Sequence, residues 1–161
     1  MATIARLEKM GTLKRWSVPL PHRERHIRSI YGTPTATNWI VSAIKETPRY
    51  GTGGTLSPRE DFYNMLIEYI CGRKFDEYEK LHTILPLPSD VWEMKSKLYR
   101  FIGWFYKPAE FIVAVSETEK RCKDHDLYLG LRRETERIRD KMDLDLPKSV
   151  TGDYRDVLLT F

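Results

Sequence analysis

The hydrophobic pattern is densest between residues 91 and 116, where three β-rich runs follow one another almost without interruption. Residues 91–95 alternate apolar and charged side chains, which is typical of a strand with one face in water. Residues 99–106 and 111–115 are almost continuously apolar, as in strands that are covered on both faces. The links between the runs are long enough only for hairpins, so an antiparallel meander is predicted. Gly103, inside the middle run, predicts a bulge or a close approach of another backbone segment.

A helix is predicted over residues 38–45, because its apolar side chains recur on one face. Thr35 or Thr37 is expected to cap it, and Pro48 to end it, since proline disfavours helical geometry at the residue before it. The glycine-rich stretch 50–55 is interpreted as a linker, because a phosphate-binding loop would need a lysine that is missing here.

The clearest helix start in the chain is at Ser57. This residue is a good N-cap, Pro58 suits the first helical position, and Glu60 completes a capping box. Gly72 is expected to end the helix. The apolar stripe of this helix is expected to face the core and consists of Phe62, Met65, Leu66, Tyr69 and Ile70.

Two further helices are predicted on either side of the meander. The first is short, covers residues 73–81, and directs Phe75, Tyr78 and Leu81 inward. The second starts at about residue 126, after a charged loop or helix start. Its apolar face is formed by Leu127, Leu131, Ile138 and Met142. Residues 157–159 are expected to dock on the body of the protein.

The N-terminal part of the chain has weaker patterns. Ile4, Leu7 and Met10 at helical spacing predict a short helix, and residues 13–20 predict an edge strand because they contain a proline. The basic residues between positions 22 and 28 leave two alternatives open. They form either a helical turn against phosphates or a solvated connector.

The expected fold class is therefore α+β. An antiparallel β-sheet meander is packed against two N-terminal helices, and a further C-terminal helix follows it. The length of 161 residues favours a single domain overall. Within it, residues 1–56 are interpreted as a basic N-terminal extension with a short helix, and residues 57–161 as the α+β core.

Composition and charge narrow the functional classes. Hydrophobic residues make up 41% of the chain, and no apolar run approaches the length of a membrane span or of a signal-peptide core, so a cytoplasmic protein is expected. The two cysteines form no CxxC pair, so neither a zinc site nor a disulfide is predicted, and no cofactor is implied. Residues 1–31 contain seven basic and two acidic residues, and residues 95–141 contain twelve and eight. These two basic blocks are candidate surfaces for a polyanion.

The middle of the chain resembles the RelE/ParE superfamily of bacterial toxins and its phage-borne relatives. The resemblance covers about residues 57–142 and rests on Trp92–Lys95 and Tyr99–Phe101, which match the family pattern (L/V)(Y/W)ELR…YR(I/F). The basic segment Lys120–Lys123 occupies the position of a paired lysine that relatives have after the last strand.

The resemblance implies a toxin-like RNA-binding protein and a ribosome-dependent, metal-independent mRNA endoribonuclease. Such chemistry needs cationic groups to hold the phosphate and a proton donor or acceptor near the 2′-hydroxyl. By resemblance, the candidate catalytic residues are Arg100 for the phosphate and His125 or Tyr128 for proton transfer. The candidate RNA-binding residues are Lys95, Lys120, Arg121 and Lys123.

Structural roles remain open as alternatives for two of these residues. Arg100 can be a cross-strand partner of Glu93, and Tyr128 a half-buried helix residue. The alternative function is a non-catalytic phage or mobile-element protein that binds a host protein or nucleic acid through its basic faces. The candidate partners are accordingly RNA or the ribosome, an antitoxin, or a host protein, with no membrane involved.

Overall fold

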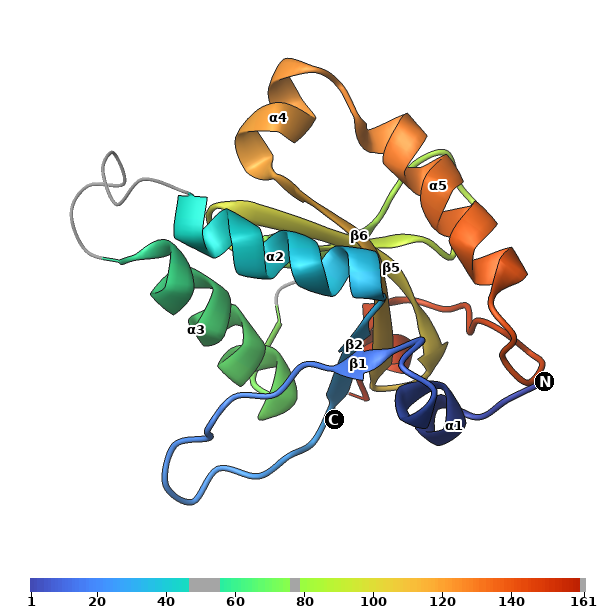
Figure 1. Ribbon diagram of the computed structural model, residues 1–161, viewed down its shortest axis with the longest axis horizontal. Coiled ribbons are helices and arrows are strands. Elements are labelled where there is room, and N and C mark those ends of the chain that lie inside the picture. The colour runs from blue at the N-terminus through green and yellow to red at the C-terminus, as the bar shows by residue number, and fades with distance from the viewer. Residues whose placement is uncertain (47–55, 76–78, 160–161) are drawn as a thin grey trace.

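A six-stranded sheet forms the centre of the computed structural model, which describes residues 1–46, 56–75 and 79–159 (Figure 1). The strands are β1 (Lys14–Arg15), β2 (Ser29–Gly32), β3 (Leu81–Thr83), β4 (Trp92–Lys95), β5 (Tyr99–Lys107) and β6 (Glu110–Thr118). Their order across the sheet is β1-β2-β6-β5-β4-β3. The sheet is mixed, because β2 runs parallel to β6 while every other neighbouring pair is antiparallel.

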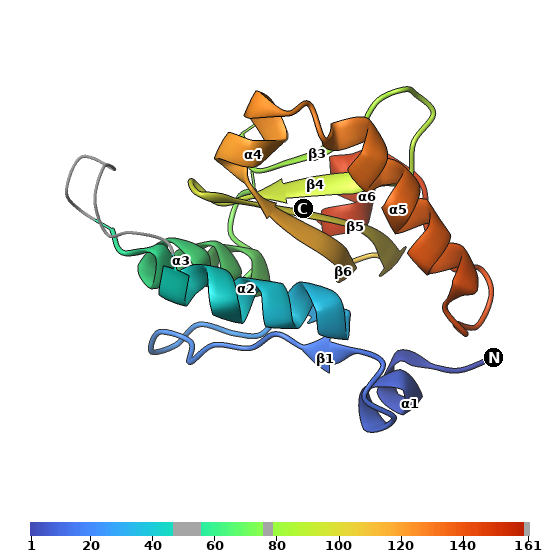
Figure 2. The ribbon, with the colours of Figure 1, turned by 45° about the horizontal axis from the view of Figure 1, so that its top comes forward.

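Helices cover both faces of this sheet. They are α1 (Ile4–Lys9), α2 (Pro34–Glu46), α3 (Pro58–Ile70), α4 (Glu119–Asp124), α5 (Tyr128–Lys141) and α6 (Tyr154–Leu158). Helices α2 and α3 lie on one side of the sheet, whereas α4 and α5 follow β6 and lie on the other (Figures 1 and 2). The α+β fold class is therefore confirmed, with helices both before and after the meander. None of the helices described is both long enough and apolar enough to cross a membrane.

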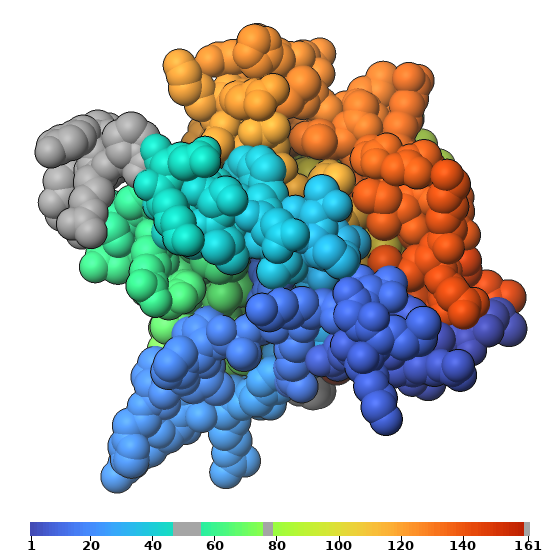
Figure 3. Space-filling view, viewed as in Figure 1, coloured from blue at the N-terminus to red at the C-terminus, as the bar shows by residue number. Residues whose placement is uncertain are grey.

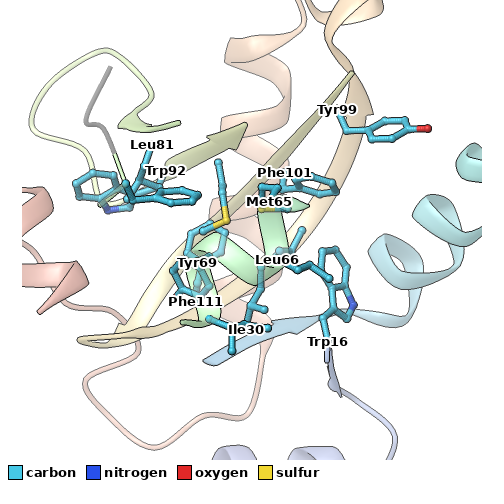
Figure 4. Packing of buried hydrophobic residues seen from close by; sticks show 14 of the residues in the cluster. Trp16, Ile30, Met65, Leu66, Tyr69, Leu81, Trp92, Tyr99, Phe101 and Phe111 are labelled. Atoms are coloured by element: carbon cyan, nitrogen blue, oxygen red, sulfur yellow. The ribbon is translucent and has the colours of Figure 1, made fainter. Parts of the chain in front are cut away.

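The largest hydrophobic cluster lies between the sheet and helices α2 and α3. Met65 and Leu66 of α3 lie against Phe101 of β5, and Trp16 lies at the end of the cluster (Figure 4). The rings of Trp16 and Phe101 meet edge to face, with their centroids 5.6 Å apart. The apolar stripe predicted for α3 is buried, as is Val157 of α6, which docks on the same cluster.

Two smaller clusters cover the opposite face of the sheet. Trp104 and Ile112 pack with residues of α1 and the segment that follows α5. Ile102 packs with Tyr128 and Leu131 of α5. Strands β5 and β6 are therefore covered on both faces, as their continuous apolar sequences predict.

The predicted meander is confirmed, since β4, β5 and β6 pair successively in antiparallel register. The register shifts between Ile102 and Gly103, as the glycine predicts. A Cβ atom on Gly103 would lie 1.8 Å from the carbonyl oxygen of Ile112, so only glycine fits there. Strand β6 continues to Thr118, beyond the apolar run, and helix α4 follows directly.

Side-chain hydrogen bonds cap the first turns of α2 and α3, the two helices on the larger cluster. The capping box at Ser57 is confirmed. Helix α2 begins earlier than predicted, because the hydroxyl of Thr33 accepts the backbone N–H of Ala36. Thr37, one of the predicted caps, instead lies inside α2 and accepts a hydrogen bond of 2.9 Å from the indole of Trp16. The predicted end of α2 at Pro48 and the linker 50–55 lie outside the described residues.

The predicted helix over residues 73–81 is wrong. Residues 73–75 are irregular, residues 79–80 form a turn, and Leu81 begins strand β3. Phe75 and Leu81 are nevertheless buried, so the apolar spacing marked core positions and not a helix. Tyr78 is outside the described residues. The expectation of a wet face on the run 91–95 is also wrong at Glu93, which is only 1% exposed.

The N-terminal segment contributes directly to the sheet. Helix α1 is confirmed, and β1 is an edge strand within the run predicted as one. Strand β2 pairs in parallel with β6, so a strand of the N-terminal extension lies beside the last strand of the predicted core. The basic stretch between β1 and β2 contains no helix and is a connector.

The close approach at Gly103 gives a first prediction. The substitution Gly103→Ala should lower the free energy of unfolding by more than about 3 kcal/mol, because the Ile112 carbonyl is held in the ladder and cannot move away. Gly130→Ala is the matched control, since a Cβ there meets nothing within 4 Å and alanine favours the helix. Urea unfolding of both variants measures the difference. Equal stabilities would contradict the tight β5–β6 contact.

Candidate functional site

A groove of about 1490 Å³ opens at the edge of the sheet formed by β3 and β4. Its polar wall contains His82, Glu93, Lys95 and Tyr128, and its apolar wall comes from the loop at residues 84–88. His82 and Glu93 are cross-strand partners, and Lys95 lies two residues beyond Glu93. These three side chains therefore project from the same face of the sheet, because side chains alternate along a strand.

Glu93 lies at the centre of the polar wall. Its Oε2 atom is 2.9 Å from Nε2 of His82, and its Oε1 atom is 3.1 Å from Nε of Arg100. The hydroxyl of Tyr128 also hydrogen-bonds to this carboxylate. Burial alone would raise the pKa of Glu93, but the hydrogen bonds from His82 and Tyr128 and the nearby positive charges lower it below its usual value. Glu93 is therefore a buried carboxylate that stays ionised.

His82 is held between two acceptors. Its Nε2 atom faces the Glu93 carboxylate, and its Nδ1 atom is 3.0 Å from the carbonyl oxygen of Thr83. A neutral imidazole has only one N–H, so only the doubly protonated ring can donate to both. The hydrogen bond to Glu93 accordingly raises the pKa of His82, against the effect of burial. The two acceptors thus favour an imidazolium on the groove wall.

Arg100 is buried beside this pair, at 6% exposure. One terminal nitrogen donates to the carbonyl oxygens of Ser96 and Tyr99, at 2.6 and 2.9 Å. The other lies 3.4 Å from Glu119 of α4. The structure therefore contains the cross-strand ion pair with Glu93 that the sequence left open as an alternative. Arg100 does not line the groove.

The two residues predicted for proton transfer are in different places. Tyr128 is the first residue of α5 and lines the groove. Burial, followed by the negative charge of Glu93 and a hydrogen bond to it, raises the pKa of Tyr128 to about 12. His125 is exposed after the last turn of α4 and is not among the residues that line the groove.

The predicted RNA-binding residues are also divided. Lys95 lines the groove, with its backbone N–H bonded to the carbonyl of Lys80. The basic residues of α4 lie instead around a second depression of about 780 Å³ between α2 and α4. Each of them forms an ion pair with an acidic residue four positions away in the sequence. Lys120 pairs with Asp124, Arg121 with Glu117 and Lys123 with Glu119. The structure therefore places Lys95 in the groove with Tyr128, and the basic residues of α4 around the other depression.

Sequence reasoning missed His82 as a site residue. It lies directly after the segment 73–81 that was predicted to be a helix, and a strand of three residues is too short to show alternation. One signal for a strand was available in the sequence, because the apolar residues Leu81 and Ile84 lie on either side of His82 in a short run between two turns. Combined with Lys95 and Tyr128, His82 gives the groove two cationic groups and a phenol, which together can bind a phosphate and transfer a proton.

Comparison with known proteins gave no match, whether to protein-family models, to curated proteins or to solved structures. The described residues also contain no group of three or more His, Cys, Asp and Glu side chains placed to hold a metal ion. The chemistry of the groove residues is therefore the basis for the function proposed below.

Because the pKa of His82 is raised in the folded protein, we predict that its contribution to stability depends on pH. The pKa of His82 is raised in the folded state above the unfolded value of about 6.5. Its contribution is therefore fully present below pH 6.5 and is lost as the pH rises through the folded pKa. His82→Gln should destabilise the protein most at pH 5.5, and the difference from wild type should shrink toward pH 8.5. Urea unfolding across this range measures it, and a difference that does not change with pH would contradict the bond to Glu93.

The environment of Arg100 predicts a structural cost for a conservative change. In Arg100→Lys a single ammonium replaces the planar fork and cannot reach Glu93, Glu119 and two carbonyl groups together. The free energy of unfolding should fall by about 2–3 kcal/mol, because buried partners lose their donors. Arg133→Lys, on the exposed face of α5, should change it little. If both variants melt as wild type, the buried network does not stabilise the fold.

Proposed function

We propose that the protein is a toxin-like RNA-binding protein that acts in the cytoplasm as a ribosome-dependent, metal-independent endoribonuclease. The RNA binds in the groove at the edge of β3 and β4. The observation that supports this site is that one buried carboxylate, Glu93, holds both His82 and Tyr128 on the groove wall, beside Lys95.

Each of these side chains has a role in cleavage by the 2′-hydroxyl. The 2′-oxygen forms a bond to phosphorus, and the bond from phosphorus to the 5′-oxygen breaks. Lys95 and the imidazolium of His82 balance the negative charge that builds on the phosphate oxygens. Tyr128 takes the proton of the 2′-hydroxyl while its own proton passes to Glu93, which avoids a phenolate beside a carboxylate.

The departing 5′-oxygen also needs a proton. The Nδ1–H of His82 supplies it by exchanging its hydrogen bond with the Thr83 carbonyl for one with the 5′-oxygen. His82 suits this role because the hydrogen bond to Glu93 raises its pKa above that of free histidine, which favours the protonated ring that a proton donor needs. After the product leaves, Glu93 returns its extra proton to solvent and His82 takes one up from solvent, while Tyr128 has kept a proton throughout.

The order of elements also supports the proposal. Helices α2 and α3 precede the meander of β4, β5 and β6, and α4 and α5 follow it. Within residues 57–142, the range of the resemblance to the RelE/ParE superfamily, the order of α3, the meander, the basic helix α4 and the C-terminal helix α5 is the one that the resemblance implies, except for its second helix before the meander. In this range the helix before the meander is α3, because the described residues 73–75 and 79–81 are not helical.

One observation favours the alternative of a non-catalytic protein that binds nucleic acid or a host protein. Arg100, the residue expected to hold the scissile phosphate, is engaged by Glu93 and Glu119 and is buried. In the catalytic proposal Lys95 and His82 take over its task. In the alternative, the groove binds its partner without cleaving it.

Two substitutions in the groove separate binding from cleavage. Tyr128→Phe should slow cleavage at least about 100-fold and leave RNA affinity unchanged, because it removes only the proton-transferring hydroxyl. Lys95→Ala should weaken binding and make it less salt-dependent, by roughly one phosphate contact. Cleavage is measured on end-labelled mRNA with purified ribosomes, and affinity by fluorescence anisotropy at several salt concentrations.

The controls make the same chemical changes elsewhere. Tyr63→Phe removes a hydroxyl from α3, and Lys9→Ala removes a charge from exposed α1. Both should behave as wild type in cleavage. Wild-type cleavage by Tyr128→Phe and Lys95→Ala would place the active site outside the groove. Salt-dependent binding by the wild type without any cleavage would support the alternative function.

A further inference from the structure

A second polar cluster lies at the opposite edge of the sheet, where β1 leads into the connector to β2. The NH2 group of Arg15 lies 2.5 Å from Nε2 of His26 and 3.3 Å from Oγ of Ser29. The hydroxyl of Ser29 is itself 3.1 Å from the same imidazole nitrogen. The connector projects from the body of the protein, as the blue lobe at the lower edge of Figure 3 shows. Both Arg15 and His26 are exposed.

The cluster contains an arginine without a carboxylate. Within the described part of the chain, Arg15 takes part in no ion pair, whereas most arginines of this protein that make polar contacts reach an acidic side chain. A guanidinium is always protonated and only donates, so His26 must accept through an unprotonated nitrogen. Partial burial and then the charge of Arg15 accordingly lower the pKa of His26. The lone pair of His26 accepts a hydrogen bond from Arg15, for which an anionic oxygen would be a stronger acceptor.

The surroundings are mostly cationic. The other exposed basic side chains of β1 and the connector are Lys14, His22, Arg23 and Arg25. The one acid of the connector, Glu24, pairs with Arg73. On the strand side, the phenol of Tyr31 interacts with Arg15 and Ser29 and also with two carboxylates, Glu110 of β6 and Glu8 of α1. These are the charged and titratable groups that face the cluster from the neighbouring elements.

We infer that Arg15, His26 and Ser29 form a phosphate-binding site for the backbone of RNA. A phosphate oxygen displaces the imidazole from the guanidinium, and His26 then takes up a proton and becomes a third donor beside Arg15 and Ser29. The proton comes from solvent, and no covalent bond changes. This inference rests on the proposed function only in taking RNA as the source of the phosphate.

The position of this site makes it independent of the groove. Five strand spacings of about 4.8 Å separate β1 from β3, so the two edges are roughly 24 Å apart. Substitutions at one edge share no contacts with the other. The site adds a fixed phosphate contact to the diffuse attraction of the basic connector.

The test follows the protonation of His26 by NMR in the full chain labelled with ¹⁵N-histidine. The probes are a single-stranded 2′-O-methyl RNA, which cannot be cleaved, and inorganic phosphate alone. His26→Asn assigns the resonance among the four histidines. The RNA should raise the apparent pKa of His26, because a phosphate oxygen replaces the imidazole as the partner of Arg15.

Matched variants decide whether the site is specific. Arg15→Ala should abolish the response of His26 and weaken RNA binding roughly tenfold, the loss of a charged hydrogen bond. Arg23→Ala removes the same charge from the neighbouring connector and should keep the response with a smaller loss of affinity. Equal losses for the two variants, or no response of His26 to RNA, would overturn the inference. A response to inorganic phosphate without one to RNA would overturn the assignment of RNA as the ligand.

The groove variants keep this test separate from the proposed function. Lys95→Ala and Tyr128→Phe should retain the response of His26 to the uncleavable RNA. A protein that never cleaves RNA but shows this response has the phosphate site and lacks the proposed activity. A protein that cleaves RNA without the response has the activity and lacks this site.

Discussion

Strand β5 is buried along eight consecutive residues, and this constraint determines how the charged residues around it are arranged. A charge inside such a strand is costly unless the protein supplies partners for it. Arg100 obtains them from three places. Glu93 comes from the adjacent strand β4, Glu119 from the start of α4, and two backbone carbonyls from the β4–β5 hairpin. The positions of β4 and α4 are therefore tied to the same guanidinium.

The carboxylate that neutralises Arg100 also organises the candidate site. Glu93 uses its second oxygen to hold His82, and Tyr128 at the start of α5 bonds to it as well. One buried residue thus connects the core of the sheet to the groove at its edge. Stability and chemistry are coupled at this point, because a change that frees Glu93 alters both the fold and the protonation of its neighbours.

The two edges of the sheet show how a partner sets the state of a histidine. At the β3 edge, His82 faces a carboxylate and a carbonyl, which favour the protonated ring. At the β1 edge, partial burial and then the guanidinium of Arg15 favour the neutral ring of His26. Both edge strands are short, with three and two residues, which limits pairing with other chains and leaves room for polar side chains. A polyanion therefore meets a histidine that favours the protonated form at the β3 edge and one that favours the neutral form at the β1 edge.

The sequence by itself determined the elements that depend on local signals. The meander followed from three apolar runs separated by hairpin links, the start of α3 from the capping box at Ser57, and the close contact at Gly103 from a glycine within a strand. Each of these is a property of neighbouring residues, so one sequence is enough to show it. The pairing of Arg100 with Glu93 was also one of the alternatives that the sequence left open, and the structure contains this ion pair.

Only the tertiary structure decided which distant segments meet. The parallel pairing of β2 with β6 joins residues about eighty positions apart, and the sequence of neither strand indicates which strand it pairs with. Leu81 ends a segment with helical spacing but begins strand β3, because pairing with β4 satisfies its backbone and buries its side chain. Glu93 was expected in water by alternation, yet α4 and α5 cover that face. The separation of Lys95 from the basic residues of α4, and the contact of Arg15 with His26, likewise arise from chain packing that acts between elements and leaves no local pattern.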